Sequence, residues 1–189
     1  MKKILCICLS ATLQKTVRFE KVQLCKVNRS QHYRFDASGK AVNSARVLNQ
    51  LEKGCSKILC PLGIENTELF LKLISRDNLD IAYVPIPGFT RECLTLLDSE
   101  AGTTTELVIS EPELCNSDFT DSTDSTDSNS KTNNNVEKIQ SAEIKILKYL
   151  NDILPDVEGV ILAGSRPGCW SEDLYSAICG IVKDAGKVF

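Results

Sequence analysis

The stretch from Asp36 to Leu48 combines residue types that suit the binding of a phosphorylated polyol. Small residues come first, and apolar side chains then recur at helical spacing from Val42 to Leu51. A small-residue turn that opens a helix lets backbone N–H groups approach an anion closely, and the helix dipole favours negative charge there. Lys40 adds a cation, and the amide of Asn43 both donates and accepts hydrogen bonds. This pattern predicts a site for phosphate and hydroxyl groups, and it also fits an ordinary connection before a capped helix.

The segments around this stretch predict alternating strands and helices. The apolar run from Lys3 to Leu9 favours a buried parallel strand over a short secretory signal, because only six apolar residues precede Ser10 and no clean cleavage site follows. Runs rich in β-branched and apolar residues predict strands, and amphipathic runs predict helices. The expected strands cover 16–35 (two strands joined around 25–26), 56–63, 81–85, 92–98, 103–109, 159–163 and the start of another at 187–189; the expected helices cover 42–54, 66–75, 136–154 and 174–185.

The order of these elements predicts the fold class. Regular alternation of strands and helices is typical of an α/β fold with a parallel sheet. Strand pairs without intervening helices interrupt this alternation, and they indicate a small β-sheet lid built from about 16–35 and 81–109. We therefore expect a Rossmann-type parallel sheet with a lid.

Composition limits the class of protein. A chain of 189 residues can bury a core as one domain. The net charge is −3 with both signs spread along the chain, so no basic block indicates nucleic acid, and no long apolar run indicates a membrane span. Nine cysteines, an odd number, stand beside one histidine without any Cys-x-x-Cys, which disfavours a zinc site or a disulfide framework. We expect reduced core cysteines and a cytoplasmic protein.

The segment 116–135 differs from the rest in composition. It is rich in Ser, Thr, Asp and Asn and almost free of apolar residues. Such a segment cannot bury enough surface to offset the entropy of ordering, so we expect a disordered insertion.

The stretch 38–48, read as Ser-Gly-Lys-Ala-Val-Asn-Ser-Ala-Arg-Val-Leu, resembles the Gly-Gly-Lys-Gly-x-Asn-x-Ala-Arg-Val-Leu signature of PfkB-type, ribokinase-like carbohydrate kinases. The branch it resembles most is that of 1-phosphofructokinase and tagatose-6-phosphate kinase. The resemblance continues in order along the chain and implies a ribokinase-like fold. The further matching segments are Leu13 with Lys15-Thr16, Val27-Asn28-Arg29, Thr90-Arg91, Thr105-Glu106-Leu107 and the loop 164–168, read as Gly-Ser-Arg-Pro-Gly.

The resemblance implies a set of sugar-phosphate contacts. The guanidinium of Arg91 would grip a phosphate bidentately, and Ser165 would lie at the carboxyl end of a central strand, where open α/β sheets bind ligands. Arg29 fits either the phosphate end of the site or a solvated strand charge. The residues implied as substrate-binding are Gln14, Gly39, Lys40, Asn43, Arg91 and Ser165.

Three departures from the family pattern affect what the chain would do. Gln14 stands where the family has a carboxylate that binds sugar hydroxyls, and so lacks a charge-assisted hydrogen bond. Ser38 and Ala41 replace two glycines of the signature. The chain ends at Phe189, before the nucleotide-binding strands and the Gly-Ala-Gly-Asp motif with its catalytic base. The resemblance therefore implies ATP and Mg²⁺ only for a complete enzyme, and we expect an N-terminal portion, truncated at the C-terminus, that is inactive alone.

Three functional hypotheses follow. The chain is the sugar-binding half of an ATP-dependent kinase of fructose- or tagatose-phosphate, working with a C-terminal kinase half from another chain. Alternatively, it is a degenerate, non-catalytic remnant or a sugar-phosphate-binding protein. A secreted protein of unrelated function is disfavoured by the ordered motif matches. The expected partners are a sugar phosphate and a second copy joined through the lid.

Overall fold

The computed structural model describes residues 3–109 and 128–189. Its centre is a parallel sheet whose strands lie in the order β5-β4-β1-β8. β1 and β4 carry nearly continuous apolar runs, which suits a sheet whose two faces are both covered by helices. Val188 pairs in parallel with Gly159, at the position of the expected strand at 187–189. The strands are β1 (Lys3–Ile7), β4 (Ser56–Gly63), β5 (Asp80–Ile86) and β8 (Val157–Leu162).

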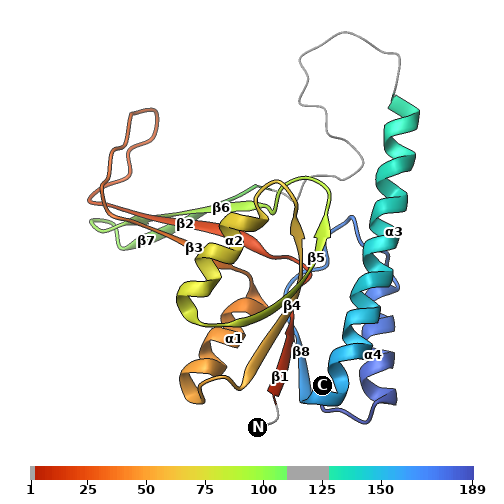
Figure 1. The fold of residues 1–189 in the computed structure, drawn as a ribbon. Coiled ribbons are helices and arrows are strands. Elements are labelled where there is room, and N and C mark those ends of the chain that lie inside the picture. Colours follow the sequence, from red (N-terminus) through yellow and green to blue (C-terminus); the bar gives the residue numbers. More distant parts are fainter. Residues whose placement is uncertain (1–2, 110–127) are drawn as a thin grey trace.

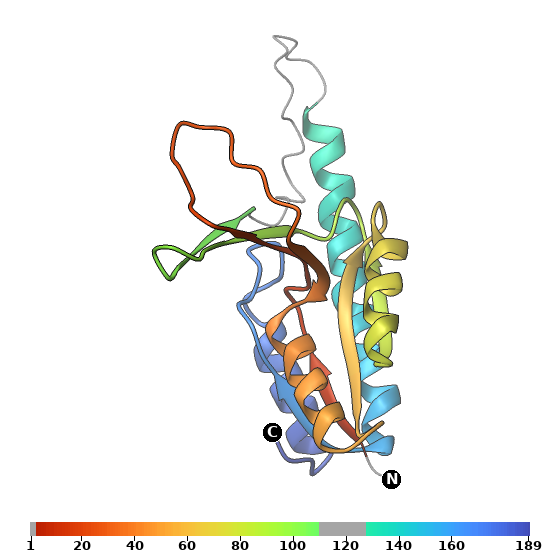
Figure 2. The ribbon, with the colours of Figure 1, turned by 90° about the vertical axis from the view of Figure 1, so that its left-hand side faces the viewer.

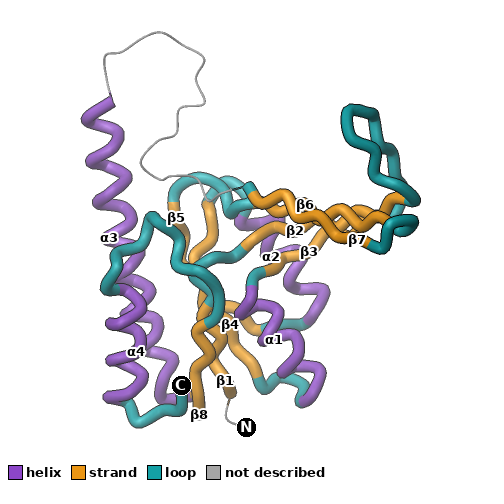
Figure 3. The backbone as a smooth tube through the Cα atoms, turned by 180° about the vertical axis from the view of Figure 1, so that it is seen from behind, coloured by secondary structure: helices purple, strands orange, loops and turns teal. Residues whose placement is uncertain are grey.

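Helices form a layer on each side of this sheet (Figures 1 and 3). Successive strand residues point to opposite faces, so β1 contributes to two cores. Leu5 and Ile7 pack in a cluster with the side chains of α3 and α4. Cys6 and Cys8 pack in the other cluster with those of α1 and α2. The helices are α1 (Lys40–Leu51), α2 (Thr67–Ile74), α3 (Ser128–Ile153) and α4 (Leu174–Asp184), with short 3₁₀ turns at Ser75–Asp77 and Leu154–Asp156.

A second four-stranded sheet, the lid, projects from the carboxyl edge of the parallel sheet (Figure 2). Its order is β3-β2-β6-β7, with β2 and β6 parallel and the outer pairs antiparallel. The fold class that the sequence predicts, an α/β fold with a parallel sheet and a small β lid, is therefore confirmed. The lid strands are β2 (Thr12–Phe19), β3 (Tyr33–Ser38), β6 (Glu92–Asp98) and β7 (Thr103–Val108).

One predicted lid strand belongs to the core instead. The expectation of lid strands from about residue 81 is wrong for 81–86, because β5 pairs in parallel with β4. The physical reason is the connection: α2 links β4 to β5, and a strand–helix–strand crossover returns the second strand beside the first. Val84 is accordingly buried in the cluster that α3 and α4 cover.

The boundaries of the first lid strands also differ from the prediction. β2 begins at Thr12, and 20–32 forms a long connection instead of strand. β3 continues to Ser38, so Gly39 alone separates it from α1. The predicted small-residue turn is therefore a strand end followed by one residue. Tertiary pairing with β2 decides this, since Ser38 lies opposite Thr12 in the register.

The expected disordered insertion is wrong for 128–135, since α3 begins at Ser128 instead of near residue 136. Packing of Ile139, Ile146 and Leu150 against the sheet anchors this helix. Extending an anchored helix through Asn, Ser and Thr costs only about 0.7 kcal/mol per residue at most relative to Ala, because nucleation is already complete. The rest of the predicted insertion, 116–127, lies outside the described residues.

Three further features of the structure concern its helices, its possible metal ligands and its cysteines. Within 3–109 and 128–189, none of the helices is long and apolar enough to cross a membrane. The same residues contain no group of three His, Cys, Asp or Glu side chains that could hold a metal ion. The eight cysteines that the structure describes are free thiols; five of them are core residues as expected, whereas Cys169 is half-buried and Cys25 and Cys179 are exposed.

Candidate functional site

Gly39 fixes the joint between the lid and the first helix. Its φ of 136° is unfavourable for residues with a side chain. A Cβ at this position would lie 2.6 Å from the sulfur of Cys8 and 3.3 Å from the carbonyl oxygen of Ser10. Ser38 and Ala41 have no such constraint, because one ends a strand and the other is helical. Their replacement of family glycines therefore introduces no backbone strain.

The N-terminus of α1 lies over the buried thiol of Cys8. Burial raises the pKa of this thiol, while hydrogen bonds from backbone N–H groups, including those of Ala41 and Val42, and the charge of Arg91 act in the opposite direction. The N–H groups of Ala41 and Val42 therefore lie near the sulfur of Cys8. That this turn presents its amides to an anion stays a prediction, and Lys40, which begins the helix, is exposed.

A chain of hydrogen bonds, here called the relay, joins the lid to α1. The Nε2 of Gln14 donates to Oγ1 of Thr95 at 3.0 Å. Its Oε1 accepts from the hydroxyl of Ser38 at 2.9 Å, and that hydroxyl accepts from Nδ2 of Asn43 at 3.4 Å. Nη1 of Arg46 donates to Oδ1 of Asn43 at 2.6 Å. Each residue of the relay donates to the next, in the order Arg46, Asn43, Ser38, Gln14, Thr95. The amide groups of Asn43 and Gln14 are therefore each held in one orientation.

Arg46 is the first donor of the relay and fixes the end that lies on α1. Its Nε donates to Oδ2 of Asp77 at 2.6 Å, and its Nη2 donates to the carbonyl oxygen of Ala37. The two side chains of this ion pair are only 17% and 27% exposed, so the pair is largely shielded from solvent. One guanidinium thus ties α1 to the end of β3 and to the turn after α2. This arrangement fixes the side chain of Asn43 relative to the lid.

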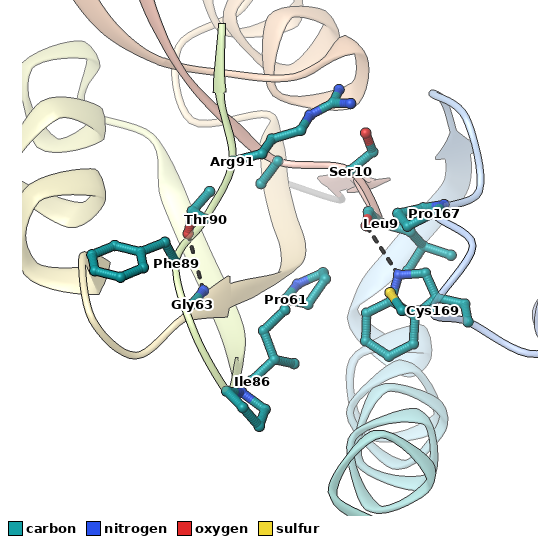
Figure 4. A pocket seen from close by; sticks show the side chains of 13 residues that line it. Leu9, Ser10, Pro61, Gly63, Ile86, Phe89, Thr90, Arg91, Pro167 and Cys169 are labelled. Carbon is teal, nitrogen blue, oxygen red and sulfur yellow. Dashed lines mark hydrogen bonds between the residues drawn. The ribbon is translucent and has the colours of Figure 1, made fainter. Parts of the chain in front are cut away.

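Arg91 lies where the lid meets a narrow cleft at the carboxyl edge of the parallel sheet (Figure 4). Its carbonyl oxygen accepts from the N–H of Leu13 at 2.9 Å and from Oγ1 of Thr12 at 3.2 Å. The cavity volume is about 30 Å³, which holds about two or three water molecules. The Ser10 hydroxyl is buried at this cleft without a hydrogen-bond partner among the described residues. Apolar walls come from Leu9, Ala11, Pro61, Ile86, Pro87, Phe89, Pro167, Cys169 and Trp170.

The loop before Arg91 is held tightly. The N–H of Gly63 donates to Oγ1 of Thr90 at 3.0 Å. The side chain of Asn66 accepts from the N–H of Thr90 at 2.8 Å and donates to its carbonyl oxygen at 3.0 Å. A Cβ at Gly63 would lie 2.3 Å from backbone atoms of Phe89 and Thr90, so only glycine fits. These contacts place the backbone of Arg91 at the mouth of the cleft.

Ser165 lies in the loop that follows β8, and its side chain is exposed. The preceding Gly164 has a φ of 121°, and a Cβ there would lie 4.0 Å from the Cβ of Ser10. The hydroxyl of Tyr175 donates to the carbonyl oxygen of Gly164 at 3.1 Å. In the same loop, the indole of Trp170 donates to the carbonyl oxygen of Leu9 at 3.2 Å. The loop is therefore fixed against the end of β1.

The structure groups the predicted site residues around the end of β1. Gln14 and Asn43 share the relay, and Gly39 borders the segment that follows β1 from the α1 side. Arg91 and the loop of Ser165 approach that segment from the lid and from β8. Arg29 is exposed in the connection between β2 and β3 and takes no part in this grouping.

Sequence reasoning did not find four residues of this grouping. In the sequence Ser38 is only a replacement for a glycine of the signature, whereas in the structure its hydroxyl is the centre of the relay. Thr95 and Arg46 supply the two ends, and Ser10 supplies the unpartnered hydroxyl. Of these four, only Arg46 could have been found from the sequence, because its spacing of three residues from Asn43 places both side chains on one face of the helix.

A family profile described as pfkB family carbohydrate kinase matches residues 1–153. A possible 1-phosphofructokinase from Thermotoga maritima superposes with a TM-score of 0.75 at 18% identity, covering 98% of this chain and 52% of that one. A putative phosphofructokinase from Staphylococcus aureus gives 0.70 at 19%, covering 97% and 51%. Phosphofructokinase-2 from Escherichia coli, in complex with fructose-6-phosphate, gives 0.70 at 16%, covering 99% and 53%. The chain therefore spans about half the length of the solved structures that share its fold.

Proposed function

Because the chain belongs to the PfkB family of carbohydrate kinases, we propose that it binds a sugar phosphate as the acceptor in ATP-dependent phosphoryl transfer. The observation that carries this proposal is that the relay and Arg91 lie together where the lid joins the carboxyl edge of the parallel sheet, since Leu13, next to Gln14, donates to the carbonyl oxygen of Arg91. Open α/β sheets bind ligands at this edge. A fructose- or tagatose-phosphate is the substrate class that we propose.

Arg91 is the proposed phosphate anchor. Its side chain is partly buried, and a guanidinium in such a place binds a phosphate through two parallel hydrogen bonds. The cleft beside it holds only about 30 Å³, far less than a sugar ring occupies. The phosphate would therefore lie at the mouth of the cleft, with the sugar extending toward the relay. Lys40, exposed at the start of α1, adds positive charge on the same side.

The relay and Ser165 are the proposed contacts for sugar hydroxyls. Gln14 uses one N–H for Thr95 and one lone pair for Ser38, which leaves a second N–H and a second lone pair for a ligand. A neutral amide makes hydrogen bonds about half as strong as those of a carboxylate. We therefore expect the phosphate to supply most of the affinity, and the hydroxyl contacts to supply less.

ATP and Mg²⁺ are the cofactors that the family implies. Mg²⁺ in phosphoryl transfer is held by carboxylates together with the phosphates of the nucleotide. Because the chain spans about half the length of the solved relatives, we assign only the acceptor side of the reaction to this part of the chain. Transfer would also require the half of the relatives that this chain does not span, in the same polypeptide or in another. Without it, the residues described would bind sugar phosphate and not turn over ATP.

A second candidate function is that of a non-catalytic sugar-phosphate-binding protein. The mutual satisfaction of Gln14 and Ser38 favours it, because these groups form a stable hydrogen bond without a ligand. The cytoplasm is the proposed location for both functions, as the free thiols are typical of a reducing compartment.

We further propose that the lid joins two copies of the chain. The register aligns Leu94 with Leu107 across two strands, and Leu96 lies on the same face of the lid as Leu94. Leu107 is 49% exposed, so this face presents apolar surface to solvent. A second copy would cover it.

The test of the binding function is a thermal-unfolding titration with fructose-6-phosphate, fructose and inorganic phosphate. A ligand that binds only the folded state at 100 times its dissociation constant stabilises by about 2.7 kcal/mol. We expect a rise in Tm with fructose-6-phosphate, a smaller rise with phosphate and none with fructose, and the first rise should vanish in Arg91→Ala. Arg18→Ala, an exposed arginine of β2, is the matched control that should keep the wild-type response. Equal shifts with fructose and fructose-6-phosphate would contradict the assignment.

A further inference from the structure

A groove of about 560 Å³ runs between the free edge of lid strand β3 and helix α2, apart from the cleft of Arg91. β3 is the last strand of its sheet, and α2 lies beside it (Figures 1 and 3). This volume lies within the range of small-molecule sites. Its lining comes from Tyr33, Arg34, Phe35 and Asp36 of β3 and from Leu69, Lys72, Leu73, Arg76 and Asp77 of α2 and the turn after it.

Both acidic groups of the groove already have cationic partners. Nε of Arg34 lies 2.7 Å from Oδ2 of Asp36, and Nε of Arg46 lies 2.6 Å from Oδ2 of Asp77. Arg34 uses only its Nε in this pair, so its two terminal nitrogens remain available to a ligand. Because Asp36 and Asp77 are already paired with arginines, they do not neutralise the other cations of the groove.

Lys72 and Arg76 are those other cations. Neither side chain makes an ion pair or hydrogen bond with any residue in the described part of the chain. They are exposed and stand four residues apart on α2 and its continuing turn, which places them on one face. Their like charges repel each other at this spacing, and a bound anion would reduce that repulsion.

The opposite wall of the groove is aromatic. The ring of Tyr33 is 65% exposed and that of Phe35 is partly buried. The ammonium of Lys15 lies 5.7 Å from the centroids of both rings and adds positive charge behind this wall. Leu69, 38% exposed, extends the apolar surface from the α2 side. A flat ring fits against such a wall.

We propose that this groove is a second ligand site, for a phosphate monoester that carries a flat ring, such as a nucleoside monophosphate. The phosphate pairs with Lys72 and Arg76, within reach of the free nitrogens of Arg34, and the ring packs against Tyr33. A phosphate dianion matches the two unpaired cations in charge.

Occupation of the groove would connect the lid to the core. The ligand contacts β3 on one side and α2 on the other, and β3 leads through Gly39 into α1. Binding would therefore favour the lid orientation seen here and hold the relay, since Ser38 ends β3. The groove thus provides a place from which a second ligand regulates the acceptor site.

The test is a calorimetric titration of AMP into the whole chain, with adenosine and inorganic phosphate as partial probes. We expect saturable AMP binding, no binding of adenosine, and phosphate binding at least tenfold weaker than that of AMP. The paired change Lys72→Glu/Arg76→Glu should weaken AMP binding at least tenfold, and Tyr33→Ser about threefold. Lys145→Glu/Lys148→Glu, at exposed positions of α3, is the charge-matched control that should weaken it less than twofold.

A further variant separates this site from the proposed acceptor site. Arg91→Ala should abolish binding of fructose-6-phosphate and leave AMP binding unchanged. Undiminished AMP affinity in Lys72→Glu/Arg76→Glu, or loss of AMP binding in Arg91→Ala, would overturn the second site without affecting the acceptor assignment. Absence of saturable AMP binding to the unchanged chain would overturn it as well. All substituted groove residues are exposed, so the variants should fold, which circular dichroism checks.

Discussion

Replacing Ser38 by alanine should reveal how strongly the relay holds the lid to α1. Ser38 is only 4% exposed, and its hydroxyl donates to Gln14 at 2.9 Å and accepts from Asn43 at 3.4 Å. The first bond is well formed and contributes about 0.5–1.5 kcal/mol, and its loss leaves the partly buried Oε1 of Gln14 without this donor. The second is long, and water replaces it because Asn43 is exposed. We therefore expect Ser38→Ala to cost about 1–2 kcal/mol of unfolding free energy.

A double-mutant cycle assigns this cost to the Gln14–Ser38 hydrogen bond. In a Gln14→Met background the acceptor is absent, so Ser38→Ala should cost about 1 kcal/mol less than in the unchanged chain. The assay is urea unfolding followed by circular dichroism, with the slope of the transition checked for constancy. Ser44→Ala is the matched control, because among the residues that the structure describes this hydroxyl donates only to the carbonyl oxygen of Lys40, one turn earlier. It should change stability by less than about 0.5 kcal/mol.

An equal cost of Ser38→Ala in both backgrounds would contradict a stabilising hydrogen bond between Gln14 and Ser38. Agreement within about 0.3 kcal/mol would mean that the two side chains do not interact energetically. A cost in Ser44→Ala as large as that in Ser38→Ala would show that any lost hydroxyl near α1 has this effect.

Three more predictions concern backbone, burial and assembly. Gly39→Ala should lower the free energy of unfolding in urea by about 2–4 kcal/mol, because φ is 136° and the new Cβ would lie 2.6 Å from the sulfur of a buried cysteine. Gly180→Ala in α4 is the control; it has open space around it and should not destabilise the protein. Burial, with smaller contributions from two nearby thiols, raises the pKa of Cys6 to about 12 from an ordinary 9.0. The thiol therefore ionises first in the unfolded chain, and the free energy of unfolding should fall between pH 9 and 12. Cys6→Ala should reduce this fall by up to about 1.4 kcal/mol per pH unit, and Cys179→Ala, at an exposed position, should not. Leu107→Asp should shift sedimentation toward monomer if the lid joins two copies, and an unchanged distribution would contradict that proposal.

Local pattern is enough to predict the parallel core. The apolar runs at β1 and β4 are buried on both faces, and the spacing of Val42 and Ala45 marks the buried side of α1. These signals are properties of the segments themselves, so the sequence carries them. The α/β class with a β lid follows from their order.

Features that depend on distant partners could not be predicted in this way. The pattern at 81–86 is that of a strand, and only its pairing with β4 decides that it belongs to the core. Ser38 and Gln14 lie 24 residues apart, and their hydrogen bond exists because β2 and β3 pair in one particular register. The groove arises likewise from the packing of α2 beside β3, two elements separated in sequence by α1 and β4.

The most direct test of the central claim is an isothermal titration of fructose-6-phosphate into the unchanged chain and into Arg91→Lys. Lysine keeps the positive charge and loses the paired, parallel hydrogen bonds of a guanidinium. If Arg91 grips the phosphate as proposed, Arg91→Lys should bind fructose-6-phosphate about tenfold more weakly, which is about 1.4 kcal/mol. Equal affinity of the two proteins for fructose-6-phosphate would contradict the claim that this arginine anchors a sugar phosphate.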